Sequence, residues 1–136
     1  MAAAWFADYQ ENCAMAGVML SITPQAAPFH AGLVAAPDWG TVAAVAHAQG
    51  CRWCGLWGED HGSALRLNAV FEKHGHYLLL RTLLDTATPL VASHTPYFPA
   101  ADRLERHAHD LLGIRYLDHP DTRRWTRHHA WRQGEY

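Results

Sequence analysis

"ALRLNAVFEKHGHYLLLRTLLD", residues 64–85, is the stretch of sequence that decides the fold. From Leu65 to Phe71 every second residue is apolar and most of the residues between them are polar, which is the pattern of a half-buried strand. Residues 77–85 are apolar on both faces, and the pair His74-Gly75 lies between the two segments. The stretch therefore predicts an antiparallel hairpin whose second strand is central in the sheet.

Upstream of the hairpin, turn and cap signals divide the chain into shorter elements. Asp38 is placed to N-cap a helix over 39–49, and Gly50 follows it at the position where helices commonly end. We further predict a helix over 5–16, a loop over 23–32, a strand over 31–36 ended by Pro37, a strand over 51–57 and a turn-rich break over 58–62.

Downstream, the pattern predicts a strand over 89–95 and a helix over 100–112 ended by Gly113. The buried stripe of that helix is predicted to be Leu104, Ala108, Leu111 and Leu112. The element order indicates an α+β fold with a mixed, largely antiparallel sheet covered by helices on one face. We expect residues 1–136 to form a single domain, in which residues 1–29 supply an N-terminal helix and loop.

Composition excludes several classes of protein. Of the 136 residues 49% are apolar and 18% charged, and the net charge of −2 argues against nonspecific nucleic-acid binding. Three cysteines without secretory context indicate reduced thiols in a cytosolic compartment. The uncharged stretch from Cys13 to Pro37 is interrupted by prolines, so we expect no membrane-spanning helix.

Three patterns suggest metal or catalytic chemistry, and none has the context that such chemistry needs. Cys51 and Cys54 sit inside a predicted strand, three residues apart, so they should lie on opposite faces and act as small buried hydrophobic residues. The eleven histidines show no convergent spacing. Ser93, His94 and Thr95 have no nucleophile elbow around them. An enzyme or metal-binding protein that uses His and Cys remains one open alternative.

The charged segment "DRLERHAHDLLGIRYLDHPDTRR", residues 102–124, needs a different explanation. Asp121 is a candidate N-cap, so Arg123 and Arg124 fall in the first turn of a helix, where the helix dipole disfavours each cation by about 0.3–1 kcal/mol. Carboxylates should compensate them, either Glu105 and Asp110 or acidic groups of another protein. A solvated pair of charged helices is the alternative, and the residues alone do not decide between the two.

Residues 93–124 resemble a known family: the C subunit, or 30 kDa-type subunit, of NADH:quinone oxidoreductase (respiratory complex I) and its counterparts in energy-converting [NiFe]-hydrogenases, called component G. The resemblance differs at His107, Leu112, Asp118 and Asp102-Arg103, where the family has Glu, Phe, Gly and Asn-Trp. The residues that carry it are Ser93, Thr95, Pro96, Pro99, Ala100, Ala101, Glu105, Arg106, Asp110, Gly113, Ile114, His119, Pro120, Asp121, Arg123 and Arg124.

This resemblance implies a non-catalytic structural or assembly subunit of a membrane-associated redox complex, on the cytoplasmic face of the inner membrane. It implies no cofactor in this subunit, with iron–sulfur clusters and nickel–iron or flavin in neighbouring subunits. The implied partners are the large subunit and the iron–sulfur subunits, and an isolated copy could form a homodimer. The departures from the family pattern favour the hydrogenase branch, with the complex I subunit as the alternative. The implied docking motif is Glu105, Arg106, Asp110, Gly113, Ile114, His119, Pro120, Asp121, Arg123 and Arg124.

Overall fold

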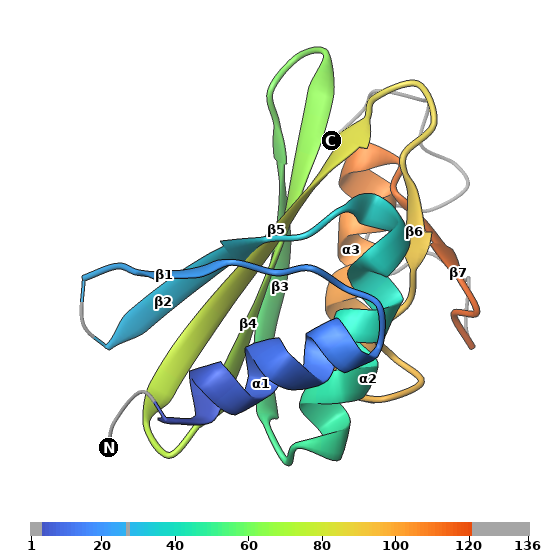
Figure 1. The fold of residues 1–136 in the computed structure, drawn as a ribbon. Coiled ribbons are helices and arrows are strands. Elements are labelled where there is room, and N and C mark those ends of the chain that lie inside the picture. The colour runs from blue at the N-terminus through green and yellow to red at the C-terminus, as the bar shows by residue number, and fades with distance from the viewer. Residues whose placement is uncertain (1–3, 27, 121–136) are drawn as a thin grey trace.

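A computed structural model describes residues 4–26 and 28–120 and centres on a twisted five-stranded sheet (Figure 1). The strand order is β1-β2-β5-β4-β3. Strand β2 pairs with β5 in parallel, and the other pairs of this sheet are antiparallel, so the predicted mixed, largely antiparallel sheet is confirmed. Its strands are β1 (Ile22–Pro24), β2 (Phe29–Leu33), β3 (Arg52–Asp60), β4 (Ala64–Lys73) and β5 (His76–Asp85).

The predicted hairpin is present, and its second strand is central. Strands β4 and β5 pair from Ala64 opposite Asp85 to Lys73 opposite His76. His74 and Gly75 both have positive φ, 55° and 79°, as a two-residue type I′ turn requires. Strand β5 lies between β4 and β2, which explains why residues 77–85 are apolar on both faces.

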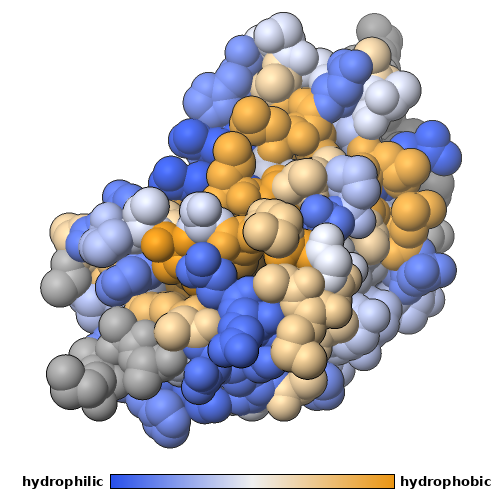
Figure 2. Space-filling model, viewed as in Figure 1, coloured by the Kyte–Doolittle hydropathy of each residue, from blue (hydrophilic) through white to orange (hydrophobic). Residues whose placement is uncertain are grey.

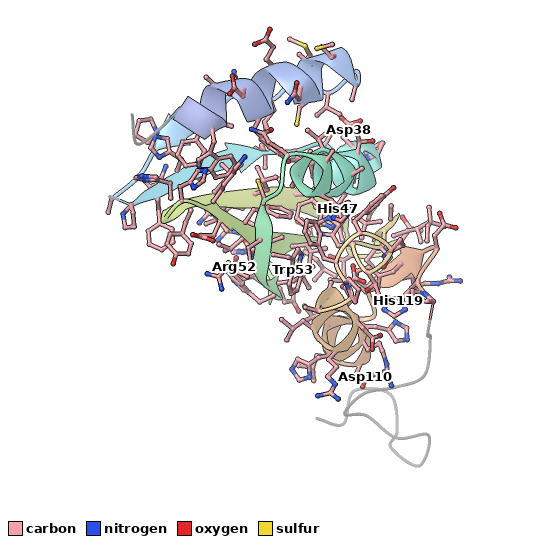
Figure 3. The ribbon with its side chains drawn as sticks, turned by 90° about the horizontal axis from the view of Figure 1, so that it is seen from below. Asp38, His47, Arg52, Trp53, Asp110 and His119 are labelled. Carbon is pink, nitrogen blue, oxygen red and sulfur yellow. The ribbon has the colours of Figure 1, made fainter. Side chains whose placement is uncertain are left out.

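Three helices cover one face of the sheet: α1 (Ala4–Met15), α2 (Trp39–Ala48) and α3 (Ala101–Leu112). Seen from below, α1 and α2 lie together on one side of the sheet and α3 packs near β3 (Figure 3). The covered face carries the core side chains of the hairpin, among them Leu65, Leu67, Phe71, Leu78 and Leu80. We call the opposite side of the sheet the open face, because no helix of the described residues covers it.

Helices α1 and α2 are joined by polar contacts as well as by apolar packing. The buried Tyr9 hydroxyl donates to the Val42 carbonyl at 2.6 Å, and Gln49 donates to the Trp5 carbonyl at 3.1 Å. Helix α1 therefore shares the core of the sheet. Asp38 is the N-cap residue of α2 as predicted, but it also ends a 3-10 turn (Ala36–Asp38) and its side chain makes no capping hydrogen bond. That the whole chain forms one domain stays a prediction.

The predicted break over 58–62 was wrong, because β3 continues through Gly58 to Asp60. The glycine serves packing rather than a turn. A Cβ on Gly58 would lie 2.5 Å from Leu112 Cδ1, so the missing side chain lets α3 approach the strand closely. The tight turn comes later, between Asp60 and Ala64.

Two other predictions of strands need correction. The predicted loop over 23–32 contains the end of β1 and most of β2, and the second strand ends at Leu33 rather than residue 36. The predicted strand over 89–95 is shorter: β6 (Leu90–Ala92) pairs in parallel with β7 (Arg115–Leu117) in a separate two-stranded sheet. Apolar atoms gather on the surface where these two strands lie (Figure 2), and Leu90 and Leu117 are exposed there.

Of the predicted buried stripe of α3 only Ala108 is buried, whereas Leu111 and Leu112 are half-buried and Leu104 is 38% exposed. The helix instead turns Ala101, Glu105 and Ala108 inward, at the spacing of successive turns. Glu105 thus occupies the buried position that the apolar periodicity assigned to the neighbouring Leu104. Gly113 ends the helix as predicted, with φ of 75° in the left-handed region.

Candidate functional site

The candidate site is built around Glu105, whose side chain is fully buried between α3 and the segment after β6. The hydroxyls of Ser93 and Thr95 each donate to Glu105 Oε1 at 2.6 Å, and the backbone N–H of His94 donates to Oε2 at 2.8 Å. The Ser93 hydroxyl also accepts from the N–H of Thr95 at 3.0 Å. Residues 93–95 therefore form a three-donor cradle for one carboxylate, which we call the Glu105 centre.

Two opposing effects act on the pKa of Glu105. Burial raises the pKa of the Glu105 carboxyl, while the hydrogen bonds from Ser93, Thr95 and the His94 amide act to lower it. The net result is a raised pKa, so the folded protein holds this proton to a higher pH than the unfolded chain does. The donors recover part of the desolvation cost of the carboxylate, as a buried charge requires.

His119, from the segment after β7, also approaches the carboxylate of the Glu105 centre. Its side chain is 3% exposed, and its Nε2 lies 3.5 Å from Glu105 Oε1 and 3.4 Å from Asp102 Oδ1. Tyr116 is close by, and burial followed by the charge of Glu105 raises the pKa of its phenol well above the usual range. The segment that follows α3 is thus tied back to the helix by side chains near Glu105.

His94, between the two hydroxyl donors, is a structural residue of the core. Its ring is fully buried, stacks on Trp39 with centroids 4.7 Å apart, and has Nε2 2.9 Å from the Trp39 carbonyl. Nδ1 accepts from Trp53 Nε1 at 3.4 Å, which makes Nε2 the protonated donor. Burial lowers the pKa of His94 to about 4, so the imidazole is neutral at physiological pH.

The remaining residues of the predicted docking motif occupy different environments. Arg106 lies on α3 with Nη1 3.4 Å from Asp102 Oδ2, and its side chain is 12% exposed. Asp110 is buried, Ile114 is fully buried, and Pro120 is exposed. Figure 3 shows Asp110 on α3 and His119 next to this helix. Asp121, Arg123 and Arg124 lie outside the described residues, so the predicted partners of the two arginines stay a prediction.

Sequence reasoning missed the donors of the Glu105 centre. Ser93 and Thr95 were recognised as part of the family pattern, but their hydrogen bonds to Glu105 were not predicted. The signal was present, because a Ser-x-Thr pair upstream of a helix offers two hydroxyls to an inward carboxylate. It went unused because the buried stripe was predicted from apolar residues alone, and Glu105 was interpreted as a partner for the two arginines.

The Cys51–Cys54 pair does not form a redox or metal site in this geometry. Cys51 is buried and Cys54 exposed, so the prediction of small buried residues was right for the first and wrong for the second. Burial raises the pKa of the Cys51 thiol to about 11 and also raises that of Cys54, which disfavours the reactive thiolate. Within residues 4–26 and 28–120, no three His, Cys, Asp or Glu side chains group as metal ligands.

The sequence is similar to one protein family and to several known proteins. Residues 33–135 match the family described as "Respiratory-chain NADH dehydrogenase, 30 Kd subunit". The NADH-quinone oxidoreductase C subunit of Caulobacter sp. (strain K31) is 45% identical over 58 residues, covering 43% of this chain and 26% of the relative. Its counterpart in Methylorubrum populi is 44% identical over 65 residues, covering 45% of this chain and 29% of the relative. The matched part spans less than a third of the length of these relatives.

Two solved structures share the fold. The trypsin-resistant fragment (1–134) of Nqo5 superposes with a TM-score of 0.68 and 19% identity, covering 89% of this chain and 99% of that chain. A chain of the membrane-bound sulfane sulfur reductase, an archaeal respiratory membrane complex, gives a TM-score of 0.72 and 13% identity, covering 83% and 68%. At these identities the likeness concerns the fold alone.

The comparisons bear on the two branches that the sequence left open. They favour the NADH-quinone oxidoreductase subunit, the alternative, over the hydrogenase branch, which the sequence analysis had placed first. None of the helices described is long and apolar enough to cross a membrane. Because the family model matches well over half of the sequence, the chain belongs to the 30 kDa subunit family of respiratory-chain NADH dehydrogenase.

Proposed function

We propose that this chain is a non-catalytic structural subunit of an NADH-quinone oxidoreductase-type complex, equivalent to its 30 kDa subunit, and docks on the large quinone-reactive subunit. The family match is the observation that carries this proposal. In this role the subunit holds no cofactor, and electrons pass through iron–sulfur and flavin groups of neighbouring subunits. Its place is peripheral, on the cytoplasmic face of the membrane.

The Glu105 centre supports the proposal by giving the family motif a physical role. A carboxylate with three hydrogen-bond donors and no exposed surface is sealed from substrates, and it fixes residues 93–95 and 116–119 against α3. The chain continues from this fixed point into Arg123 and Arg124. In the proposed role, Glu105 and Asp110 stabilise the domain, whereas the two arginines contact carboxylates on the large subunit or brace the same segment.

Co-purification tests the proposed function. The full chain is co-expressed with the large quinone-reactive subunit encoded in the same genome, and the pair is separated by size-exclusion chromatography. We expect a one-to-one complex, and reduced complex formation for Arg124→Glu, with Arg115→Glu, at an exposed position of β7, as a matched charge reversal. Metal content of the purified chain is measured in parallel. Absence of a complex together with one bound metal ion per chain would overturn the proposal in favour of a His/Cys metal protein.

The same experiment separates the two branches of the family. A nickel-binding large subunit in place of the quinone-reactive subunit is the partner that the hydrogenase reading requires. Offered both proteins, the chain is expected to form its complex with the quinone-reactive large subunit. Stable association with the nickel-binding protein alone would instead support the hydrogenase reading.

A further inference from the structure

Several large apolar side chains on the open face are exposed to solvent. Leu33 is 62% exposed, Leu83 54%, Trp57 45% and Phe29 42%. The strand register places them on the side opposite the helices, because their neighbours along each strand point into the core. Apolar side chains that are exposed together on one face of a sheet are candidates for an interaction surface.

A pocket of about 420 Å³ lies at the β1, β2, β4 and β5 part of the open face. It is lined by apolar, hydroxyl and guanidinium groups, including Thr23, Leu33, Arg66, Arg81 and Leu83. Leu33 pairs in register with Arg81, and Arg66 pairs with Leu83, so leucine and arginine alternate across the strands. The pocket thus offers cationic and apolar contacts side by side.

The two arginines of the pocket differ in their partners. Arg66 donates to both oxygens of Glu59, at 2.8 and 2.9 Å, so its charge is compensated within the domain. Arg81 forms no ion pair with a carboxylate of the described residues, and its Nε is buried without a hydrogen-bond partner there. A buried, unpaired donor on a charged group indicates a ligand that is missing from the isolated chain.

We propose that the open face binds a segment of the large subunit in which a carboxylate is flanked by apolar side chains. The carboxylate accepts hydrogen bonds from the Arg81 guanidinium, and the apolar side chains cover Leu33 and Leu83. This inference rests on the proposed function and names the surface through which it acts. A second copy of the chain fits less well, because a two-fold contact through this face would place the same cationic and apolar groups on both sides.

Site-specific cross-linking of the full chain in its complex with the large subunit tests the location. A photoreactive phenylalanine analogue replaces Leu33 or Leu83, and in control variants it replaces Met19, which is 86% exposed on the segment after α1. We expect cross-links from residues 33 and 83 to a large-subunit segment that contains Asp or Glu. Cross-links only from residue 19, or from residues 33 and 83 to residues 121–136 or to a second copy, would overturn the proposal while leaving the proposed function intact.

Affinity measurements test the chemistry. Arg81→Gln should raise the Kd for the large subunit about tenfold through loss of charge-assisted hydrogen bonds. Arg81→Lys keeps the positive charge but loses the planar, bidentate guanidinium, so its Kd should lie between those of Arg81→Gln and the wild type. Arg52→Gln removes a 69%-exposed arginine from the same sheet and should bind as wild type does. An unchanged Kd for Arg81→Gln in a protein that unfolds at the wild-type midpoint would overturn the inference, and complete absence of binding by the wild type would overturn the proposed function as well.

Discussion

Buried charged groups on the two faces of the sheet differ in whether they have hydrogen-bond partners. On the helix-covered face, Glu105 has no exposed surface and receives three hydrogen bonds from the protein's own donors. On the open face, Arg81 has a buried Nε with no partner among the described residues. The donors around Glu105 offset part of the cost of burying its carboxylate, whereas a partly desolvated charge without a partner prepares a surface for binding.

Removing the carboxylate of the Glu105 centre should have the largest effect. Glu105→Ala leaves the donors of Ser93, His94 and Thr95 without an acceptor and opens a cavity, so it should lower the free energy of unfolding by about 3–5 kcal/mol. Urea denaturation followed by circular dichroism measures this change. The amide of Glu105→Gln can accept from the His94 N–H and donate to the hydroxyls, so this variant should lose much less free energy of unfolding. Equal losses for the Ala and Gln variants would contradict a stabilising role for these hydrogen bonds.

Substitutions at two glycines of β3 allow a direct comparison of the two faces of the sheet. A Cβ on Gly58 would meet Leu112 at 2.5 Å, whereas a Cβ on Gly55 has nothing within 4 Å. Gly58→Val should therefore lower the free energy of unfolding by about 1–3 kcal/mol through overpacking against α3. Gly55→Val should be neutral or stabilising, because it replaces a flexible residue with a strand former. Equal thermal shifts for the two variants would mean that α3 does not pack closely on β3.

The pH dependence of stability should have opposite signs on the two faces. The pKa of Glu105 is raised, so its ionisation costs stability as pH rises from the unfolded-state pKa through the folded one. The hydrogen bonds from Arg66 and Asn68 lower the pKa of Glu59 to about 2, so its contribution is present above the unfolded pKa and is lost as pH falls toward 2.

Paired variants isolate these two carboxylates from other titrating groups such as His94. The free energy of unfolding is measured in urea at several pH values for wild type, Glu105→Gln and Glu59→Gln. Relative to wild type, Glu105→Gln should improve as pH rises through the Glu105 titration, and Glu59→Gln should improve as pH falls. The same slope for both variants would contradict the assignment of opposite environments.

The smallest effect on stability is expected from Arg81. Because this side chain makes no ion pair within the described part of the chain and its Nε is buried without a partner, Arg81→Leu should leave the free energy of unfolding unchanged or raise it. Thermal unfolding checks this expectation, with Arg66→Leu as the matched control that breaks the pair with Glu59. A large loss for Arg81→Leu would show that this arginine stabilises the domain instead of awaiting a partner.

The sequence predicted the features that depend on local patterns. The β4–β5 hairpin, the fold class and the end of α3 at Gly113 follow from alternation, turn chemistry and the left-handed preference of glycine. The break predicted at Gly58 was wrong because close packing and turns both select glycine, and only the position of Leu112 distinguishes them. Strand β1 was missed because three residues ending in proline carry no periodic signal.

The candidate sites depend on contacts that one-dimensional patterns do not contain. Glu105 was left out of the predicted buried stripe because a carboxylate is buried only when donors from another segment reach it, here Ser93 and Thr95. The pocket at Arg81 was missed because it arises from the pairing of β5 with β2 in parallel and β4 in antiparallel orientation. The family motif located the region of the Glu105 centre, but the role of each residue required the fold.

Side-chain footprinting of the complex tests the central claim most directly. Hydroxyl radicals oxidise exposed side chains, and the oxidation of Leu33, Leu83 and Trp57 on the open face is compared in the free chain and in the complex with the large subunit. Met15 and Met19, which are 82% and 86% exposed, serve as internal references. We predict strong protection of the open-face residues in the complex and unchanged oxidation of the methionines. Undiminished oxidation of Leu33 and Leu83 in a fully formed complex would contradict the account.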